Sequence, residues 1–133
     1  MVVSYLQEEF GGHEFYLCRE LSKMGHEVTL YTSNRTRPGY GKKKYISENS
    51  HFAEGFEIKR FHTPLEISEI PIMQGLEKTL KRDALDVIHA HEFFQVCSLT
   101  ACRVAQMKKV PFILTVHGSG GLPLRKSIWF PFF

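Results

Sequence analysis

The chain has 133 residues, of which 43% are hydrophobic and 23% are charged. This composition is typical of one globular domain that can bury its own core, and it excludes an intrinsically disordered protein. The net charge of +3 is too small for a nucleic-acid-binding surface, and no apolar run has the length of a membrane span. We therefore expect a single domain over residues 1–133 that has no nucleic-acid partner.

The cysteines and the basic residues indicate the compartment. Cys18, Cys97 and Cys102 lie in apolar helical patterns without C-x-x-C spacing, which predicts reduced thiols in the core. The N-terminus lacks the pattern of a signal peptide, so we expect a cytoplasmic protein. The basic run Lys42–Lys44 is typical of a solvated face, with peripheral contact to anionic lipid at the inner membrane surface as the alternative.

The first half of the chain predicts a strand, a helix and a second strand. Residues 2–6 form a short run rich in β-branched side chains, which predicts a buried strand. Apolar residues at helical spacing predict a helix over residues 13–24, and Gly25 follows as its stop signal. The second strand covers residues 28–32. Residues 34–55 are polar and basic without a sustained period, and they predict a surface loop.

The second half alternates in the same way. A strand at residues 56–61 is followed by a loop with two prolines and then by a helix at residues 72–82. The fourth strand, at residues 87–90, leads to a helix at residues 94–107. The fifth strand covers residues 112–116.

Strands that alternate with helices predict an α/β fold, a Rossmann-like open parallel sheet with helices on both faces. In the common strand order 3-2-1-4-5, the first and fourth strands are neighbours, and a crevice opens outside their carboxyl ends. Gly11 and Gly12 follow the first strand, His91 follows the fourth, and His117 and Gly118 follow the fifth. We therefore expect these five residues at one cleft.

The pair Gly11-Gly12 precedes a helix. Glycines allow a ligand to approach the backbone, and a helix N-terminus presents N–H groups to an anion such as a phosphate. An ordinary tight turn stays open as the alternative. The turn lacks the G-x-G-x-x-G pattern, and Thr32-Ser33-Asn34-Arg35 after the second strand contains no acid for a ribose. Dinucleotide binding is therefore disfavoured.

His89 and His91 are two residues apart, so they share one face if the strand continues. Metal ligation together with Glu92 or His117 is the less favoured interpretation, because no H-E-x-x-H motif or cysteine pair accompanies them. His89 lies within the apolar run and is expected to be a buried core histidine. His91 follows Ala90 and is the predicted ligand-facing residue.

Four segments, taken together and in this order, resemble the N-terminal domain of family 4 glycosyltransferases, which have the GT-B architecture. They are Gly11-Gly12-His13-Glu14, Gly25-His26-Glu27-Val28, Asp86-Val87-Ile88-His89-Ala90-His91-Glu92 and Leu114-Thr115-Val116-His117-Gly118. The likeness extends over most of the chain. It implies the N-terminal, acceptor-side half of a two-domain enzyme whose active site lies between the domains.

The resemblance also implies the reaction and the residues that perform it. A sugar would move with retention of configuration from a nucleotide-sugar to an acceptor, which is a glycan, a lipid or a small molecule. Neither a metal nor another cofactor is expected. His91 matches the histidine that contacts the transferred sugar and is the expected catalytic residue. The expected donor-binding and substrate-binding residues are Gly11, Gly12, His117 and Gly118. Glu14 matches a motif position whose expected role is structural.

In this family the nucleotide is held by a C-terminal domain that carries an E-x7-E motif, and the resemblance implies that this second domain is absent from residues 1–133. The resemblance therefore implies an incomplete enzyme that is inactive alone, either a fragment or the product of a truncated gene. The alternative function is a catalytically inactive binding or assembly module of the same fold. The apolar run at residues 128–133 predicts self-association in either case.

Overall fold

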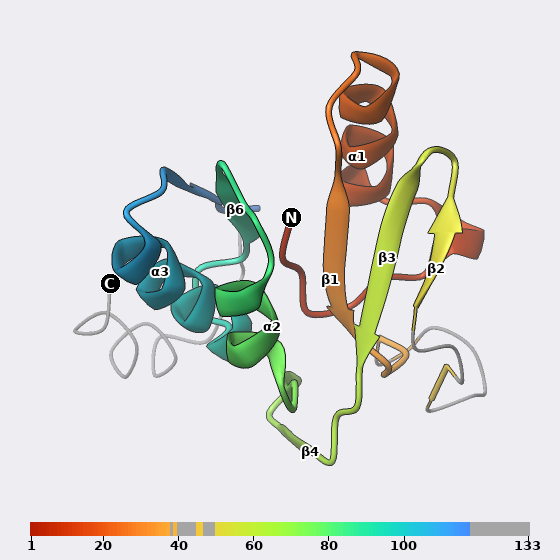
Figure 1. Cartoon of the computed structure of the whole chain (residues 1–133). Helices are drawn as coiled ribbons and strands as arrows, with labels where there is room; N and C mark the ends of the chain where they lie inside the picture. The colour runs from red at the N-terminus through yellow and green to blue at the C-terminus, as the bar shows by residue number, and fades with distance from the viewer. Residues whose placement is uncertain (38, 40–44, 47–49, 118–133) are drawn as a thin grey trace.

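The structure of the chain is a computed structural model that describes residues 1–37, 39, 45–46 and 50–117 (Figure 1). Three features expected from the sequence lie outside these residues. They are Gly118, the basic run Lys42–Lys44 and the apolar run at residues 128–133. Within the described part of the chain, no helix combines the length and the apolar character needed to cross a membrane.

Helices and strands alternate along the described residues. The helices are η1 (Glu8–Phe10), α1 (His13–Lys23), α2 (Leu76–Arg82) and α3 (Val96–Lys108). The strands are β1 (Thr29–Ser33), β2 (Ser50–Ala53), β3 (Phe56–Phe61), β4 (Leu65–Ile67), β5 (Ile70–Ile72), β6 (Ile88–His91) and β7 (Phe112–Thr115).

The main sheet has the predicted order. β1 pairs in parallel with β3, and β6 pairs in parallel with β7. The first residues of the chain lie between β1 and β6. The N–H of Val2 donates to the His89 carbonyl (2.8 Å), the N–H of His91 donates to the Val2 carbonyl (3.0 Å), and the N–H of Val3 donates to the Tyr31 carbonyl (3.0 Å). The parallel segments therefore follow the order 3-2-1-4-5, and the prediction is confirmed.

The expected first strand at residues 2–6 is shorter than predicted. Val2 forms isolated bridges to Tyr31 and Ala90, and no continuous strand is present there. Beyond Ser4 the chain leaves the sheet, and the guanidinium group of Arg60 binds the carbonyl of Leu6 at 3.1 Å. This contact directs the backbone toward η1 and the glycine turn.

The predicted loop at residues 34–55 contains a strand, so this prediction is wrong in part. β2 pairs antiparallel with β3 at the edge of the sheet. The two-residue turn Glu54–Gly55 joins the two strands, and both of its residues have positive φ, 45° and 92°. This is the backbone conformation that tight hairpins prefer.

The predicted helix at residues 72–82 begins later than expected. A small hairpin, β4–β5, occupies the preceding segment and includes Ile72. Its turn, Ser68–Glu69, also has positive φ at both residues. Helix α2 therefore starts at Leu76.

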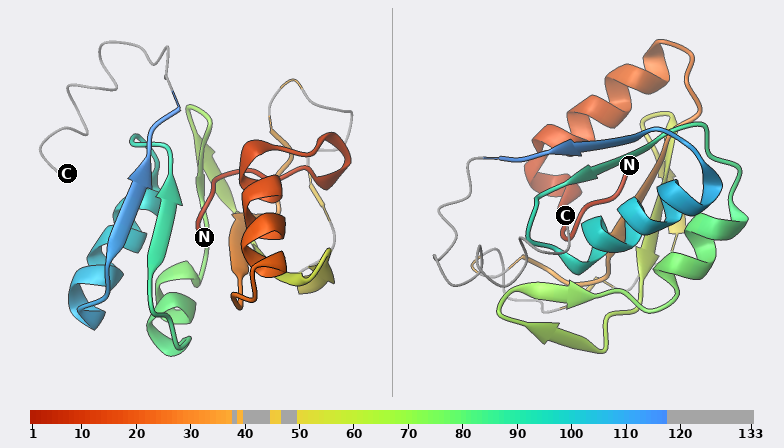
Figure 2. Two further views of the ribbon diagram at one scale, coloured as in Figure 1. Left: turned by 90° about the horizontal axis from the view of Figure 1, so that it is seen from above. Right: turned by 90° about the vertical axis from the view of Figure 1, so that its left-hand side faces the viewer.

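Side chains alternate along the strands and divide the core between the two faces of the sheet. Helices α2 and α3 cover one face, where the buried cluster includes Val2, Tyr31, Ile88, Ala90 and Val104. Helix α1 covers the other face, where the buried cluster includes Val3, Phe15, Cys18, Leu30 and Ile58. Figure 2 shows α1 on the opposite side of the sheet from α2 and α3, which confirms the predicted helices on both faces. All three cysteines are free, as predicted.

Candidate functional site

Strand β6 directs two histidines toward the face that carries α1. Ile88 and Ala90 pack in the cluster beneath α3, so the alternating residues His89 and His91 project to the opposite face. Their rings stack with centroids 4.4 Å apart. His91 is the last residue of β6, whereas we expected the strand to end one residue earlier.

The burial of the two histidines is the reverse of the expectation. His91 is 1% exposed, whereas His89 is only partly buried. The Nε2 atom of His89 lies 2.8 Å from Oγ1 of Thr115 on β7, so the polar ring of His89 has a hydrogen-bond partner. His91, the residue that was predicted to face a ligand, therefore lies in the protein interior.

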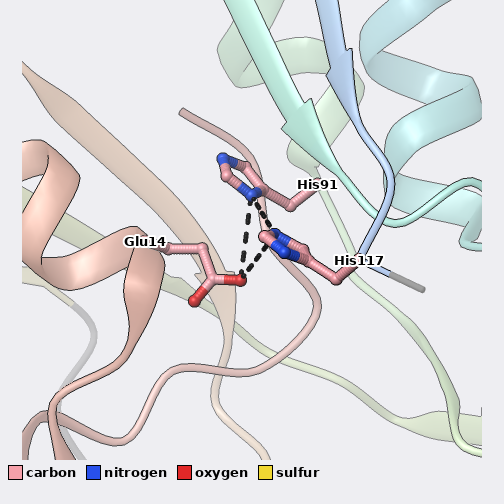
Figure 3. A group of neighbouring side chains, drawn as sticks. All are labelled: Glu14, His91 and His117. Carbon is pink, nitrogen blue, oxygen red and sulfur yellow. Dashed lines mark hydrogen bonds and ion pairs between the residues drawn. The ribbon is translucent and has the colours of Figure 1, made fainter. Parts of the chain in front are cut away.

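Three side chains converge beside the end of β6, as Figure 3 shows. Nδ1 of His91 lies 2.8 Å from Nε2 of His117, which follows β7. Oε1 of Glu14, in the first turn of α1, lies 3.5 Å from Nε2 of His117 and 3.8 Å from Nδ1 of His91. We call these three residues the histidine–glutamate cluster. His117 and Glu14 are 33% and 24% exposed, so they stand between His91 and the solvent.

The pKa of His91 is lowered to about 3. Burial is the largest cause, and the next largest are the electrostatic interactions with His89 and His117. Burial is also the main cause of the lowered pKa of His89. His91 is therefore neutral at pH 7 and carries one N–H group. One of the two facing ring nitrogens must donate in the contact with His117. The Nε2 atom of His91 is buried and has no hydrogen-bond partner among the described residues.

The glycine turn lies next to this cluster. Gly12 is the N-cap of α1, with φ 156° and ψ 154°, and Gly11 has φ 62° and ψ −155°. Side chains are strained in both conformations, and a Cβ atom on Gly11 would also meet the Tyr16 ring, with Cζ at 2.7 Å. The N–H groups of the first turn of α1 have no acceptor within the helix. Because of this, the turn suits an anion.

A cavity of about 240 Å³ opens at the glycine turn. Its lining residues are Tyr5, Leu6, Gln7, Gly11, Gly12, Glu14 and Arg37. Glu14 belongs both to this cavity and to the histidine–glutamate cluster, so the two are contiguous. A larger groove of about 570 Å³ lies beside α2 and α3 and has none of the predicted site residues in its lining.

The structure thus brings together four of the five predicted site residues, Gly11, Gly12, His91 and His117; the fifth, Gly118, lies outside the described residues. Glu14 and Arg37 were not predicted to take part in the site. The available signal for Glu14 was its position, because an acid in the first turn after the first strand lies at the same sheet edge as His91. Arg37 appears in the sequence only as one of several basic residues before β2.

A comparison with protein families supports the expected relationship. The model for glycosyltransferase family 4 matches residues 13–132, a range that contains Glu14, His91 and His117 and begins just after Gly12. No curated protein matches the chain. The match extends over most of the chain and agrees with the α/β fold, so the chain belongs to glycosyltransferase family 4.

Proposed function

We propose that the chain forms the acceptor-side part of a retaining glycosyltransferase that uses a nucleotide-sugar donor. In this reaction the bond between the anomeric carbon and the donor diphosphate breaks, and a bond to an acceptor oxygen forms on the same face of the sugar. The acceptor proton leaves with the diphosphate. Membership of family 4 supports the reaction class. The convergence of Gly12, Glu14, His91 and His117 at one sheet edge is the observation that carries the proposal.

The donor phosphates would lie at the glycine turn. The backbone N–H groups at the start of α1 carry partial positive charge, and the guanidinium group of Arg37 carries a full one. Both line the same cavity. A phosphate there would lie within reach of the histidine–glutamate cluster, because Glu14 borders both. The transferred sugar would then extend toward His91.

Contact between the sugar and His91 requires a movement of His117. The ring of His117 covers Nδ1 of His91 at 2.8 Å and is itself one third exposed. Rotation of this partly exposed ring would uncover His91 without disturbing the sheet. We therefore assign the direct sugar contact to His91 and a gating role to His117. Gly118, which follows His117 in the sequence, remains an expected substrate-binding residue.

Other parts of the proposal come from the sequence. The transfer itself would need no metal, and the acceptor would be a glycan, a lipid or a small molecule. The three free cysteines suit a reducing compartment, and we place the reaction in the cytoplasm. Contact of Lys42–Lys44 with anionic lipid at the inner membrane face and self-association through residues 128–133 remain predictions. The resemblance assigns the nucleotide to a second domain, so residues 1–133 alone should bind the donor weakly.

Amide NMR of the labelled chain during a titration with UDP-glucose tests this proposal. We expect saturating shifts at Gly11, Gly12, Glu14 and His91, with a dissociation constant near 1 mM, or about −4 kcal/mol. Glucose alone and inorganic phosphate alone are the controls, and each should reproduce only part of the pattern.

Three results would count against the proposal. Shifts confined to the groove beside α2 and α3 would place the donor elsewhere. The absence of any shift at about 10 mM donor would favour the alternative, a catalytically inactive binding or assembly module. A micromolar dissociation constant would contradict the assignment of the nucleotide to a second domain.

A further inference from the structure

We propose that the histidine–glutamate cluster is a binding site for a divalent transition-metal ion of the zinc type. Each of the three residues offers one ligand atom, and these atoms lie within 4.8 Å of one another. The ligands come from the first turn of α1, the end of β6 and the residue that follows β7 by two positions. The site is thus built by the tertiary fold. It shares His91 and His117 with the metal site considered from the sequence, but Glu14 takes the place of His89 as a ligand.

The distances between the three ligand atoms suit the bond lengths of a zinc ion. Distances of 2.8, 3.5 and 3.8 Å define a triangle whose circumscribed circle has a radius of about 2.0 Å. A single point therefore exists about 2.0 Å from Nδ1 of His91, Nε2 of His117 and Oε1 of Glu14. Zinc binds imidazole nitrogen and carboxylate oxygen at about 2.0–2.2 Å.

Only a small adjustment would convert this arrangement into a tetrahedral site. Ligand atoms around a tetrahedral zinc lie about 3.3 Å apart, so the two histidine nitrogens would have to separate by about 0.5 Å. The metal would replace the direct contact between the rings of His91 and His117. The ring of His117 can make this movement, because it is partly exposed whereas His91 is buried.

The identity of the ligands restricts the metal. Two imidazoles and one carboxylate are the protein ligands in one class of catalytic zinc sites, where water takes the fourth position, and imidazole also suits cobalt, nickel and copper. Magnesium and calcium prefer oxygen ligands and should bind poorly. The partial exposure of Glu14 and His117 gives an ion a path of entry and leaves the fourth position to water.

Neighbouring rings hold the two histidines in place. His91 stacks on His89 with ring centroids 4.4 Å apart, and the ring of His13 meets the edge of His117 at 5.2 Å. These contacts limit the rotamers of both ligands before a metal arrives. A preorganised site binds more tightly than one that must be assembled from mobile side chains.

Isothermal titration calorimetry of the full chain with ZnCl₂ tests the proposal, with MgCl₂ as the comparison. We expect one zinc ion per chain and no heat of binding for magnesium. His117→Ala and Glu14→Gln should each weaken zinc binding by at least about tenfold. His26→Ala is the matched control, because it removes an exposed histidine outside the cluster and should bind zinc as the parent chain does.

Cobalt provides a second measurement that does not depend on affinity alone. The intensity of the visible bands of bound Co²⁺ should indicate four-coordinate geometry in the parent chain and in His26→Ala, and this signal should be lost in His117→Ala. Far-ultraviolet circular dichroism checks that each variant is folded, and Glu14→Gln decides the question if His117→Ala does not fold. Equal zinc affinity in His26→Ala, His117→Ala and Glu14→Gln would overturn the proposal, as would the absence of zinc binding.

Discussion

His91 and His117 meet through their ring nitrogens, with Nδ1 of one 2.8 Å from Nε2 of the other and the ring planes inclined by only 14°. The residues come from the ends of neighbouring parallel strands, since the register of β6 and β7 pairs His91 with Thr115. This contact separates His91 from the solvent. Both the proposed sugar contact and the proposed metal site require it to open.

The burial of His91 predicts a stability cost that depends on the size of the replacement. His91→Ala should lower the free energy of unfolding by about 2–4 kcal/mol, because a ring that is 1% exposed leaves a cavity. His91→Phe fills that space and removes an Nε2 atom without a hydrogen-bond partner among the described residues. Its cost should therefore stay below about 1.5 kcal/mol.

Urea denaturation followed by circular dichroism measures both effects. His89→Ala is the comparison, and it should cost less than His91→Ala because His89 is only partly buried. If His91→Ala and His89→Ala cost equally little, the ring of His91 does not belong to the core.

Arg60 positions the chain that leads to the glycine turn. Its side chain is 1% exposed and donates to Oε1 of Glu8 at 2.8 Å and to the carbonyl of Leu6 at 3.1 Å. Arg60→Ala should cost about 1–3 kcal/mol, because the change removes the donor to the buried Leu6 carbonyl and one of the two partners of Glu8, which also pairs with His51. Arg60→Lys should restore only part of this stability, since an ammonium group lacks the fork of donors that reaches both partners.

Thermal unfolding of the two variants provides the check, with Arg19→Ala as the control. Arg19 forms ion pairs near the surface with Glu20 and Glu54, and because solvent screens such pairs, its loss should cost much less than the loss of Arg60. Full rescue by Arg60→Lys would show that charge alone, and not the two directed hydrogen bonds, holds this segment.

Asp83 should make the stability depend on pH. Its Oδ2 atom accepts hydrogen bonds from Oη of Tyr31 and Nζ of Lys59, both at 2.8 Å. Burial acts to raise the pKa of Asp83, but the hydrogen bonds from Lys59 and Tyr31 outweigh it, and the pKa lies below its ordinary value of 3.8. A carboxyl group with a lowered pKa in the folded chain adds stability above its unfolded pKa and loses it as the pH falls through the folded value.

We therefore expect Asp83→Asn to cost about 1–2 kcal/mol at pH 7, and we expect the difference from the parent chain to shrink below about pH 4. Denaturant titrations at a series of pH values provide the comparison. A difference that stays constant from neutral pH to about pH 3 would mean that the ionised form of Asp83 does not provide the stabilisation.

The order of the sheet could be predicted because strands that alternate with helices commonly follow one order, and each of the parallel strands contains buried apolar residues that mark it in the sequence. The two hairpins could not. β2 is an edge strand with exposed Ser50 and Phe52, so it lacks that apolar signal. Its turn, Glu54–Gly55, and the turn Ser68–Glu69 do not carry the Asn-Gly or Asp-Gly pairs that mark a tight hairpin in sequence.

The candidate site shows the same division. Gly12, His91 and His117 could be placed together because the carboxyl ends of neighbouring parallel strands share one edge. The position of Glu14 depends on how the first turn of α1 docks against that edge, and no local pattern reports this. The two-residue period places His89 and His91 on one face, but their relative burial depends on His117, which covers the end of the strand.

The central claim is that a nucleotide-sugar contacts His91, and a donor titration of three proteins tests it most directly. UDP-glucose is added to the parent chain, to His91→Phe and to His26→Ala, and the shift of the Gly12 amide is followed by NMR. The account predicts equal millimolar binding by the parent chain and His26→Ala, and binding about tenfold weaker by His91→Phe, the equivalent of one lost hydrogen bond of about 1.4 kcal/mol. Equal donor binding by folded His91→Phe would contradict the account.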